Sequence, residues 1–501
     1  YQDALESSEN RQAQNNSKMQ KVLQGDFERY VRTQISKKDR KLIEKEYNDR
    51  YNHRATIPFD GSTVSVRGMS NSFYGVNDFT IYKHNKMVAE KLAWHGQGGN
   101  FHDVGAGKTV ATLLLATMQK QRGVMNKPMF VVPAKVQKKW VEEHMMLFPD
   151  AKILSLNLQS DTRKKELALA QMYDWDAIYI NEFAFARLPL SPNVESRMVE
   201  RRLDYFDEVL EEYVESLDPG MGKRARKQLE KEREKLEGRI SDLNNVQRDD
   251  ADVFFDEMGI DGLVVDEAHN YKNAMGSPLA QKLNIASAIS QRAEDMLIKT
   301  KYLRNQIGDK NVFVLTATPV VNSPIEVWHM LNLCAPDLLD KYNIANMDNF
   351  ITNFVTWEQK IVRKTSGDFD QKEVVDGYIN VPEMQSIIDE MTDVKSYDQL
   401  IEWYKENPDI ITKSDGSTTE LKPKFKRPNA IVKDEVIEQS DVHFLLFEDI
   451  MLRANNVIES MKSGEDTSDN FLVITADGSL ISTDLRLYSE QFRGFDHESL
   501  K

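Results

Sequence analysis

The chain has 501 residues, of which 40% are hydrophobic and 29% charged, so it carries enough apolar material for a sizeable core, and a wholly disordered chain is excluded. Its 80 acidic and 65 basic residues give a net charge of −15, which excludes a general cationic affinity for nucleic acid, so binding to DNA or RNA needs a local basic track. The single cysteine excludes an intrachain disulfide, and the sequence shows neither a signal-peptide pattern nor a bilayer-spanning apolar stretch, so we expect an aqueous, reducing, intracellular setting with no membrane.

Residues 1–80 are polar and predict an N-terminal helical arm. Because the chain starts at Tyr1 rather than at a methionine, we expect a processed product or a fragment. Apolar residues at helical spacing predict amphipathic helices at residues 22–35 and 42–47, followed by a short β-like segment at residues 63–67. We expect this arm to pack on the core.

From residue 81 to residue 335, short apolar runs alternate with helical stretches. Helices are predicted at residues 109–121 and 136–148. Buried strands are predicted at residues 129–132, 153–156, 177–180, 262–265 and 312–315. Alternating apolar strands and helices indicate a parallel sheet covered on both faces.

One charged segment, residues 194–245, interrupts this alternation. Apolar residues recur three and four apart on both sides of a turn at residues 219–222, which predicts an antiparallel helical hairpin inserted outside the sheet. We expect its apolar seam to be self-sufficient. The basic residues at its tip are either a solvated charge cluster or a contact for phosphate or a partner: Lys223, Arg224, Arg226 and Lys227.

Residues 336–501 are helical, acidic and irregular, and are predicted to form a connector. Loops are expected at residues 365–375 and 413–428. A β-hairpin is expected at residues 471–482, with Asp477-Gly478 at its turn.

The segment Asp103-Val-Gly-Ala-Gly-Lys-Thr109 follows a short strand-like run at residues 100–102 and opens a helix. Glycines let backbone N–H groups approach phosphate oxygens closely, and the helix N-terminus favours negative charge. Lys108 is suited to the β- and γ-phosphates, and the Thr109 hydroxyl to Mg²⁺. The pattern departs from the usual phosphate loop at His102, which stands where the first glycine is expected.

Two further strand ends carry polar groups. Asp266 and Glu267 end the apolar run in Leu263-Val-Val-Asp-Glu-Ala-His269, where Asp266 can hold Mg²⁺ and Glu267 can deprotonate an attacking water. The alternative is a surface strand end with solvated acids. Thr316 and Thr318 end another apolar run in Val314-Leu-Thr-Ala-Thr-Pro319. We expect these two threonines to hydrogen-bond His269 and to sense the nucleotide state.

A Gly-Lys-Thr loop, an Asp-Glu-Ala-His strand end and a Thr-Ala-Thr-Pro strand end, in this order, resemble the first motor lobe of superfamily 2 helicases. Phe130-Val-Val-Pro133 with Trp140, and Leu315 to Asn322 with Glu326, Trp328 and Leu331 after it, are similar to the SNF2-type branch. Over about residues 40 to 490 the chain resembles the helicase half of methylase–helicase proteins of phages and mobile elements, some of which are antirestriction factors and some of which are packaged in virions. The segments that carry this narrower resemblance are residues 42–48, 59–62, 102–109, 469–472 and 484–487.

This resemblance implies an α/β fold: a RecA-like, doubly wound parallel sheet with an inserted helical hairpin and helical N- and C-terminal extensions. Residues 81–335 would form the first ATPase lobe, with ATP and Mg²⁺ as cofactors. The implied catalytic residues are Lys108, Asp266, Glu267 and His269, and the implied metal ligands are Thr109 and Asp266. The implied nucleotide-binding residues are Gly105, Ala106, Gly107, Lys108, Thr109 and Asn85. Asn85, the implied contact for adenine, lies in Lys83-His84-Asn85, where the family usually has a glutamine.

The resemblance also implies partners. DNA, duplex or single-stranded, would contact the positions Lys135, Lys138, Lys139 and Arg187, for which plain solvated side chains are the alternative. Motifs V and VI are missing, so we expect a second RecA-like lobe, which carries the arginine finger, beyond Lys501 or in another chain, and weak turnover without it. No Asn-Pro-Pro-Tyr-like motif is present, so DNA methylation is not expected.

Three functions compete. The favoured one is an ATP-dependent DNA translocase or helicase in the cytoplasm of a bacterial host, or carried in a phage virion with virion proteins as partners. An RNA helicase is the second, and Trp140 with the segment from Glu326 to Trp328 favours the SNF2-type branch over it. A virion or structural protein with an inert motor fold is the third.

Overall fold

The computed structural model divides the chain into two units, residues 1–59 and residues 60–501, and the fold below is that of the second unit. The structure describes residues 35–36, 38–39, 41–42, 45, 59–215, 230–231, 233–241, 253–277, 279–280, 283, 285, 290–320, 323–363, 369–412, 416–421, 440–463 and 469–492. The helix expected at residues 22–35 therefore lies outside the described residues except for Ile35. Of the helix expected at residues 42–47, residues 42 and 45 are described and are helical.

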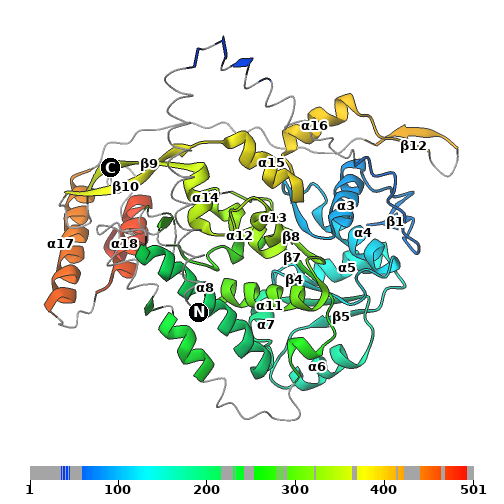
Figure 1. Ribbon diagram of the computed structural model, residues 1–501, viewed down its shortest axis with the longest axis horizontal. Helices are drawn as coiled ribbons and strands as arrows, with labels where there is room; N and C mark the ends of the chain where they lie inside the picture. Colours follow the sequence, from blue (N-terminus) through cyan, green and yellow to red (C-terminus); the bar gives the residue numbers. More distant parts are fainter. Residues whose placement is uncertain are drawn as a thin grey trace, which may run out of the picture. The chain divides into compact units, whose positions relative to one another are not determined.

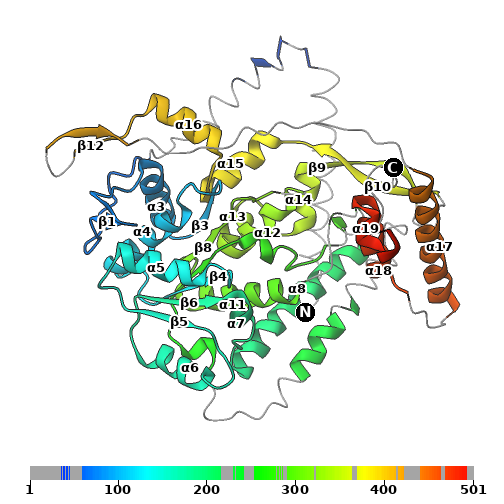
Figure 2. The ribbon, with the colours of Figure 1, turned by 180° about the vertical axis from the view of Figure 1, so that it is seen from behind.

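Seven parallel strands form the central sheet. Their order across the sheet is β11-β3-β8-β7-β4-β6-β5, and Figure 2 shows β3, β8, β4, β6 and β5 in that succession. The strands are β3 (Gly98–His102), β4 (Pro128–Val132), β5 (Ile153–Leu156), β6 (Ala177–Asn181), β7 (Gly262–Val265), β8 (Val312–Leu315) and β11 (Thr392–Lys395). The five strands predicted from apolar runs are confirmed.

Helices cover both faces of the sheet. Met129 and Val131 of β4 face one hydrophobic cluster, whereas Phe130 and Val132 face another, as the two-residue period of a strand requires. The chain moves from β3 through β4 to the β5 edge and then returns through β6, β7 and β8, so right-handed crossovers place the two sets of helices on opposite faces. This is the doubly wound, RecA-like arrangement that the sequence predicted (Figure 1).

The buried apolar residues of the helices that cover the sheet belong to one or the other of these two clusters. On one face lie α3 (Lys83–His95), α4 (Lys108–Gln121) and α5 (Gln137–Leu147). On the other lie α6 (Arg163–Met172), α7 (Glu182–Ala186), α8 (Pro192–Glu215), α11 (Gln291–Ile307), α12 (Ile325–Cys334), α13 (Pro336–Lys341), α14 (Met347–Phe354) and α15 (Val381–Met391). In the described part of the chain, no helix is both long and apolar enough to cross a membrane.

The sheet continues past Ala335, where the sequence analysis placed the end of the lobe. Strand β11 pairs in parallel with β3, and α13, α14 and α15 contribute side chains to the same core. The four residues of β11 are Thr-Asp-Val-Lys, so this edge strand has no apolar run that the sequence analysis could recognise.

The described residues of the inserted hairpin contribute no strand to the sheet, but the apolar seam of the hairpin is not self-sufficient. Ion pairs join Glu195 to Arg239 and Asp207 to Arg233, so the two helical segments of the hairpin run antiparallel. Val199 and Leu236 are buried in the core cluster that also holds α11 residues, so the expectation of an independent seam is wrong. The turn at residues 219–222 and the basic tip lie outside the described residues.

Three local expectations are corrected. Residues 63–67 are not a strand; a short hairpin follows instead, β1 (Ser72–Phe73) with β2 (Val76–Asn77). The loop expected at residues 365–375 includes much of a long strand, since β9 (Val355–Arg363) pairs with β10 (Phe369–Tyr378). Part of the loop expected at residues 413–428 is strand β13 (Thr418–Glu420), which pairs with β12 (Ile410–Thr412).

The hairpin expected at residues 471–482 is helix α18 (Phe471–Thr483). Asn470 caps it, because its side-chain oxygen accepts hydrogen bonds from the backbone N–H groups of Leu472 and Val473. Asp477, the expected turn residue, instead accepts a hydrogen bond from Arg453 of α17 (Asp441–Ser463). These contacts, with a small shared core of α17, α18 and α19 (Leu485–Tyr488), favour the helix over the Asp-Gly turn.

Candidate active site

Three neighbouring strands, β3, β8 and β7, end at the same edge of the sheet. The phosphate loop, residues 102–109, begins at the last residue of β3; Thr316 follows β8; and Asp266 follows β7. Because ligands of open parallel sheets bind at the carboxyl ends of the strands, this edge is the candidate active site.

Two glycines of the phosphate loop adopt backbone angles that favour glycine. Gly105 has φ +80° and Gly107 has φ +85°. A Cβ on Gly107 would lie 2.4 Å from Nδ2 of Asn85, so a side chain there would also collide with a buried neighbour. Asn85 therefore lies against the loop itself, and its expected role towards adenine stays a prediction.

Lys108 begins α4 and folds over the loop. Its Nζ donates to the carbonyl oxygens of His102 at 2.8 Å and Asp103 at 3.1 Å. Burial lowers the pKa of Lys108, while the nearby carboxylates of Asp266 and Glu267 act in the opposite direction. The ammonium and the two carboxylates thus share one electrostatic environment. Thr109, the expected metal ligand, is the second residue of α4 and is half-buried.

Asp266 is half-buried and directly follows β7. Burial, reinforced by the negative charge of Glu267, raises the pKa of Asp266 to about 6. The indole N–H of Trp140 donates to Asp266 Oδ2 at 3.0 Å and lowers that pKa. Two adjacent carboxylates at a half-buried strand end favour a cation between them and the phosphates, which fits Mg²⁺.

Glu267 has a left-handed backbone, with φ +50°, a conformation that costs free energy for a residue with a Cβ and is common at functional sites. Its Oε2 lies 3.2 Å from Nδ1 of His269. The same nitrogen lies 3.0 Å from Thr316 Oγ1, which accepts the backbone N–H of Thr318 at 3.1 Å. The strand ends of β7 and β8 are thus linked from Glu267 to Thr318, with the expected His269–Thr316 contact present.

His102, in the position of the missing first glycine, is fully buried as the last residue of β3. Its Nε2 lies 3.3 Å from Asp393 Oδ1 of β11. Burial acts to raise the pKa of Asp393, but the contact with His102 and the positive charges of Lys91 and Lys395 lower it. The imidazole therefore points towards the neighbouring edge strand.

The structure adds a contact that sequence reasoning missed. Lys272, three residues after His269, forms an ion pair of 2.7 Å with Glu326 at the start of α12. Trp328 of the same helix is buried and donates to the carbonyl oxygen of Ile344 at 2.7 Å. The ion pair therefore holds the residues after β7 against the residues after β8. Lys272 lies in no motif that would have identified it from the sequence.

The four expected nucleic-acid contacts follow β4 and β6, which are adjacent. Lys135 and Arg187 are exposed. Lys138 lies 3.7 Å from Glu142 and Lys139 lies 3.6 Å from Glu143, so both lysines have a carboxylate neighbour on their own helix. Their role towards nucleic acid stays a prediction.

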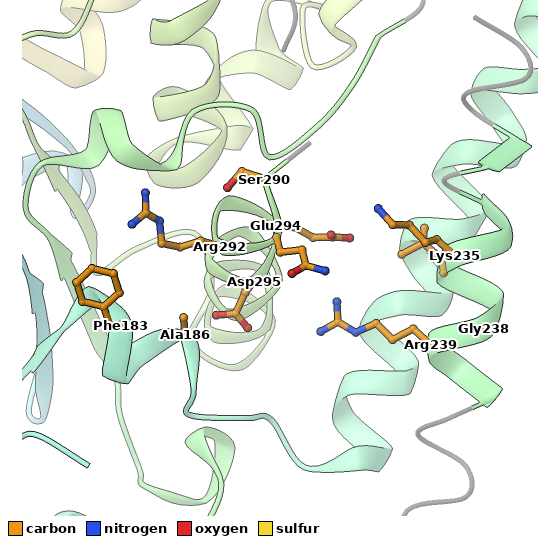
Figure 3. Close-up of a pocket in the computed structure, with 11 residues that line it drawn as sticks. Phe183, Ala186, Lys235, Gly238, Arg239, Ser290, Arg292, Glu294 and Asp295 are labelled. Atoms are coloured by element: carbon orange, nitrogen blue, oxygen red, sulfur yellow. The ribbon is translucent and has the colours of Figure 1, made fainter. Parts of the chain in front are cut away.

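A cavity of about 1070 Å³ lies between α7, the start of α11 and residues 235–239 of the hairpin (Figure 3). Its described lining residues include none from the phosphate loop or from residues 263–269. Three of its charged lining residues form ion pairs: Asp295 with Lys299, Glu294 with Arg202, and Arg239 with Glu195. The cavity is lined by other residues than the candidate active site.

Among the described residues, no cluster of three or more His, Cys, Asp or Glu side chains could hold a metal on its own. Mg²⁺ is typically bound through one or two protein ligands, substrate phosphates and waters. Thr109 and Asp266 fit that donor set.

The chain matches a family model and is similar to a phage protein. A family model described as "Probable helicase domain" matches residues 92–396. The chain is similar to "Defense against restriction protein B" of Escherichia phage P1, with 24% identity over 419 residues that cover 76% of this chain and 18% of that protein. The chain thus spans less than a fifth of that relative's length.

Solved structures of the Sulfolobus solfataricus SWI2/SNF2 ATPase core are also similar. The core in complex with dsDNA has 15% identity and a TM-score of 0.36, over 82% of this chain and 57% of that chain. The core domain has 15% identity and a TM-score of 0.37, over 70% of this chain and 48% of that chain.

Proposed function

This chain belongs to the helicase-domain family whose model matches residues 92–396, and on that premise we propose that it is the ATP-binding first motor lobe of an ATP-dependent DNA translocase or helicase of the SNF2-like branch. The observation that carries the proposal is the shared environment of Lys108, Asp266 and Glu267 at the carboxyl ends of β3 and β7, which flank β8. One positive and two negative groups around a glycine-rich turn suit a magnesium-bound triphosphate.

Each residue has a distinct part in this proposal. Backbone N–H groups of the phosphate loop and the start of α4 hold phosphate oxygens, and Lys108 turns from the loop carbonyls to the β- and γ-phosphates. The Thr109 hydroxyl and the Asp266 carboxylate hold Mg²⁺, which when bound neutralises phosphate charge.

Glu267 accepts the proton of the attacking water. Its neighbour His269 contacts Thr316, so a change in the charge of Glu267 is transmitted to the end of β8. Thr318, through its backbone N–H to Thr316, extends this link.

DNA is the proposed polymer, and the segments after β4 and β6 are its proposed track. The exposed cations there are Lys135, Lys138, Lys139 and Arg187. The name of the phage relative, which concerns defence against restriction, supports an antirestriction role for a protein that contains this lobe, in a bacterial host cell or a phage virion. A second lobe, in the same polypeptide or in another chain, would supply an arginine to the transferred phosphoryl group.

The test measures binding of a fluorescent ATP analogue with Mg²⁺, together with ATPase activity in the presence of duplex DNA, single-stranded DNA or RNA. In protein that also contains the second lobe, Lys108→Ala should abolish productive nucleotide binding and with it turnover, whereas Lys152→Ala, which removes an exposed lysine, should not. If RNA stimulates the ATPase activity and neither form of DNA does, the polymer is RNA and not DNA. Equal nucleotide binding by wild type and Lys108→Ala would refute the assignment of the loop.

A further inference from the structure

We propose that Tyr404 positions the phosphate loop through His84, so that residues 392–409 act as a clasp that keeps the loop in the shape that binds nucleotide. The clasp begins with β11 and includes α16 (Tyr397–Glu406). The inference rests on the proposed function of the loop, but it concerns residues that lie some three hundred positions further along the chain.

The central contact is a chain of two hydrogen bonds. His84 Nε2 lies 2.8 Å from the carbonyl oxygen of Ala106, and His84 Nδ1 lies 2.8 Å from the Tyr404 hydroxyl. A carbonyl oxygen can only accept, so Nε2 must carry the proton, and Nδ1 of a neutral ring must accept the proton of Tyr404. The hydroxyl therefore selects the tautomer of His84 that holds Ala106.

Burial makes this arrangement stable. His84 is 4% exposed and Tyr404 is 7% exposed. Burial lowers the pKa of His84 to about 4, so the ring is neutral at pH 7, as the tautomer requires. Loss of the Tyr404 hydroxyl would leave Nδ1 of a buried ring without its donor.

The direction of the Ala106 carbonyl matters for phosphate binding. In a planar trans peptide the C=O and the following N–H point in opposite directions. When His84 holds the carbonyl of Ala106, the N–H of Gly107 is directed away from His84. Successive N–H groups fixed in this way form an anion-binding concavity.

Three further contacts attach the clasp to the loop and to α3. Lys395 of β11 pairs with His102 in the sheet, and its carbonyl oxygen accepts the N–H of Asp103 at 3.0 Å. The Tyr397 hydroxyl lies 2.9 Å from the position that a Cβ on Gly105 would take. Asp409 Oδ2 accepts the N–H of Lys83, the first residue of α3, at 3.0 Å. The loop is therefore held from the outside along much of its length.

Tyr404→Phe isolates the hydroxyl. The aromatic ring, which packs edge-on to His84 with centroids 5.7 Å apart, is retained, so a merely structural role of the ring would not be affected. Tyr378→Phe is the matched control, because it removes the hydroxyl of a tyrosine that is 41% exposed in β10. Both are made in the full 501-residue chain.

The first measurement is hydrogen–deuterium exchange without nucleotide. In Tyr404→Phe the amides of residues 104–109 should exchange about five- to tenfold faster, while those of β8 should be unchanged. The second is titration with a fluorescent ATP analogue and Mg²⁺, where the Kd should rise by a similar factor. The third is ¹⁵N NMR of labelled histidine, where wild-type His84 should show the Nε2–H tautomer.

Wild-type loop exchange in Tyr404→Phe would overturn the proposal, as would an equal acceleration throughout the lobe. Faster loop exchange with an unchanged Kd would overturn the claim that the clasp sets nucleotide affinity. If Lys108→Ala binds nucleotide as well as wild type does, the proposed function fails, and the loop exchange still decides whether Tyr404 positions the loop.

Discussion

Trp140 donates its indole N–H to Oδ2 of Asp266 at 3.0 Å, so a side chain on the helix after β4 acts on the carboxylate at the end of β7. The two residues are 126 positions apart, and β4 and β7 are neighbours in the sheet. The hydrogen bond lowers the pKa of Asp266, against the larger opposing effect of burial. Trp140 thus helps to keep the proposed magnesium ligand ionised.

Replacing Trp140 by Phe should weaken magnesium-dependent nucleotide binding. The aromatic ring remains but the hydrogen bond is lost, so the pKa of Asp266 rises further and less of the carboxylate is ionised at pH 6.5. We expect a loss of about three- to tenfold in affinity at that pH. Trp94→Phe, at an exposed position on α3, is the control and should bind as wild type does. Unchanged affinity of Trp140→Phe across pH 5.5–7.5 would contradict the link.

The raised pKa of Asp266, about 6, predicts a pH dependence. Because the folded pKa lies above the ordinary value of 3.8, the contribution of this residue to stability falls as pH rises from about 4 to 6 and is constant above that. Binding of Mg²⁺ needs the ionised form, so magnesium-dependent nucleotide affinity should rise about tenfold from pH 5 to pH 7. The nucleotide phosphate also titrates at about pH 6, so Asp266→Asn supplies the reference curve. Identical curves for the two proteins would exclude Asp266 as the titrating group.

Glu267→Gln should retain nucleotide binding and lose hydrolysis. The amide keeps the shape of the side chain but cannot accept the proton of water. In protein that also contains the second lobe, we expect ATP turnover to fall about 10²- to 10⁴-fold, while the affinity for nucleotide stays within about threefold of wild type. Binding and phosphate release are measured side by side. A loss of binding in folded protein would show that Glu267 is structural.

Gly107→Ala should disturb the phosphate loop more than the strain of a positive φ angle alone would. At Gly123 the φ angle is +70° and a Cβ would meet nothing within 4 Å, so Gly123→Ala reports backbone strain by itself, at about 1 kcal/mol. At Gly107 the added Cβ also meets Asn85 at 2.4 Å. We expect Gly107→Ala to abolish nucleotide binding while Gly123→Ala preserves it. Similar nucleotide binding by both variants would show that the Asn85 side chain can move aside without disturbing the loop.

The packed seam of the inserted hairpin gives a stability prediction. Leu236 is 5% exposed within the core cluster of α11, so Leu236→Ala should lower the free energy of unfolding by about 2–3 kcal/mol. Leu472→Ala, at a position that is 82% exposed, should change it by less than about 0.5 kcal/mol. Urea unfolding of both variants makes the comparison. If Leu236→Ala leaves the free energy of unfolding unchanged, the hairpin is independent of the lobe.

The sequence by itself determined the parallel sheet and the positions of the groups at its edge. Apolar runs of four or five residues that end in Asp266 or Thr316 fix strand ends through local composition, and strand ends in a parallel sheet share one edge. Glycines beside Lys108 identify a phosphate loop because the backbone angles required there are local as well.

Only the tertiary structure decided what surrounds that edge. The strand β11, the tautomer of His84 and the hydrogen bond from Trp140 to Asp266 depend on partners far away in the chain, and their residue types carry no periodic pattern. The Asp477-Gly478 pair predicted a turn, yet contact with Arg453 and burial against α17 favour a helix there. Local preferences are worth a few tenths of a kcal/mol to about 1 kcal/mol, and buried contacts outweigh them.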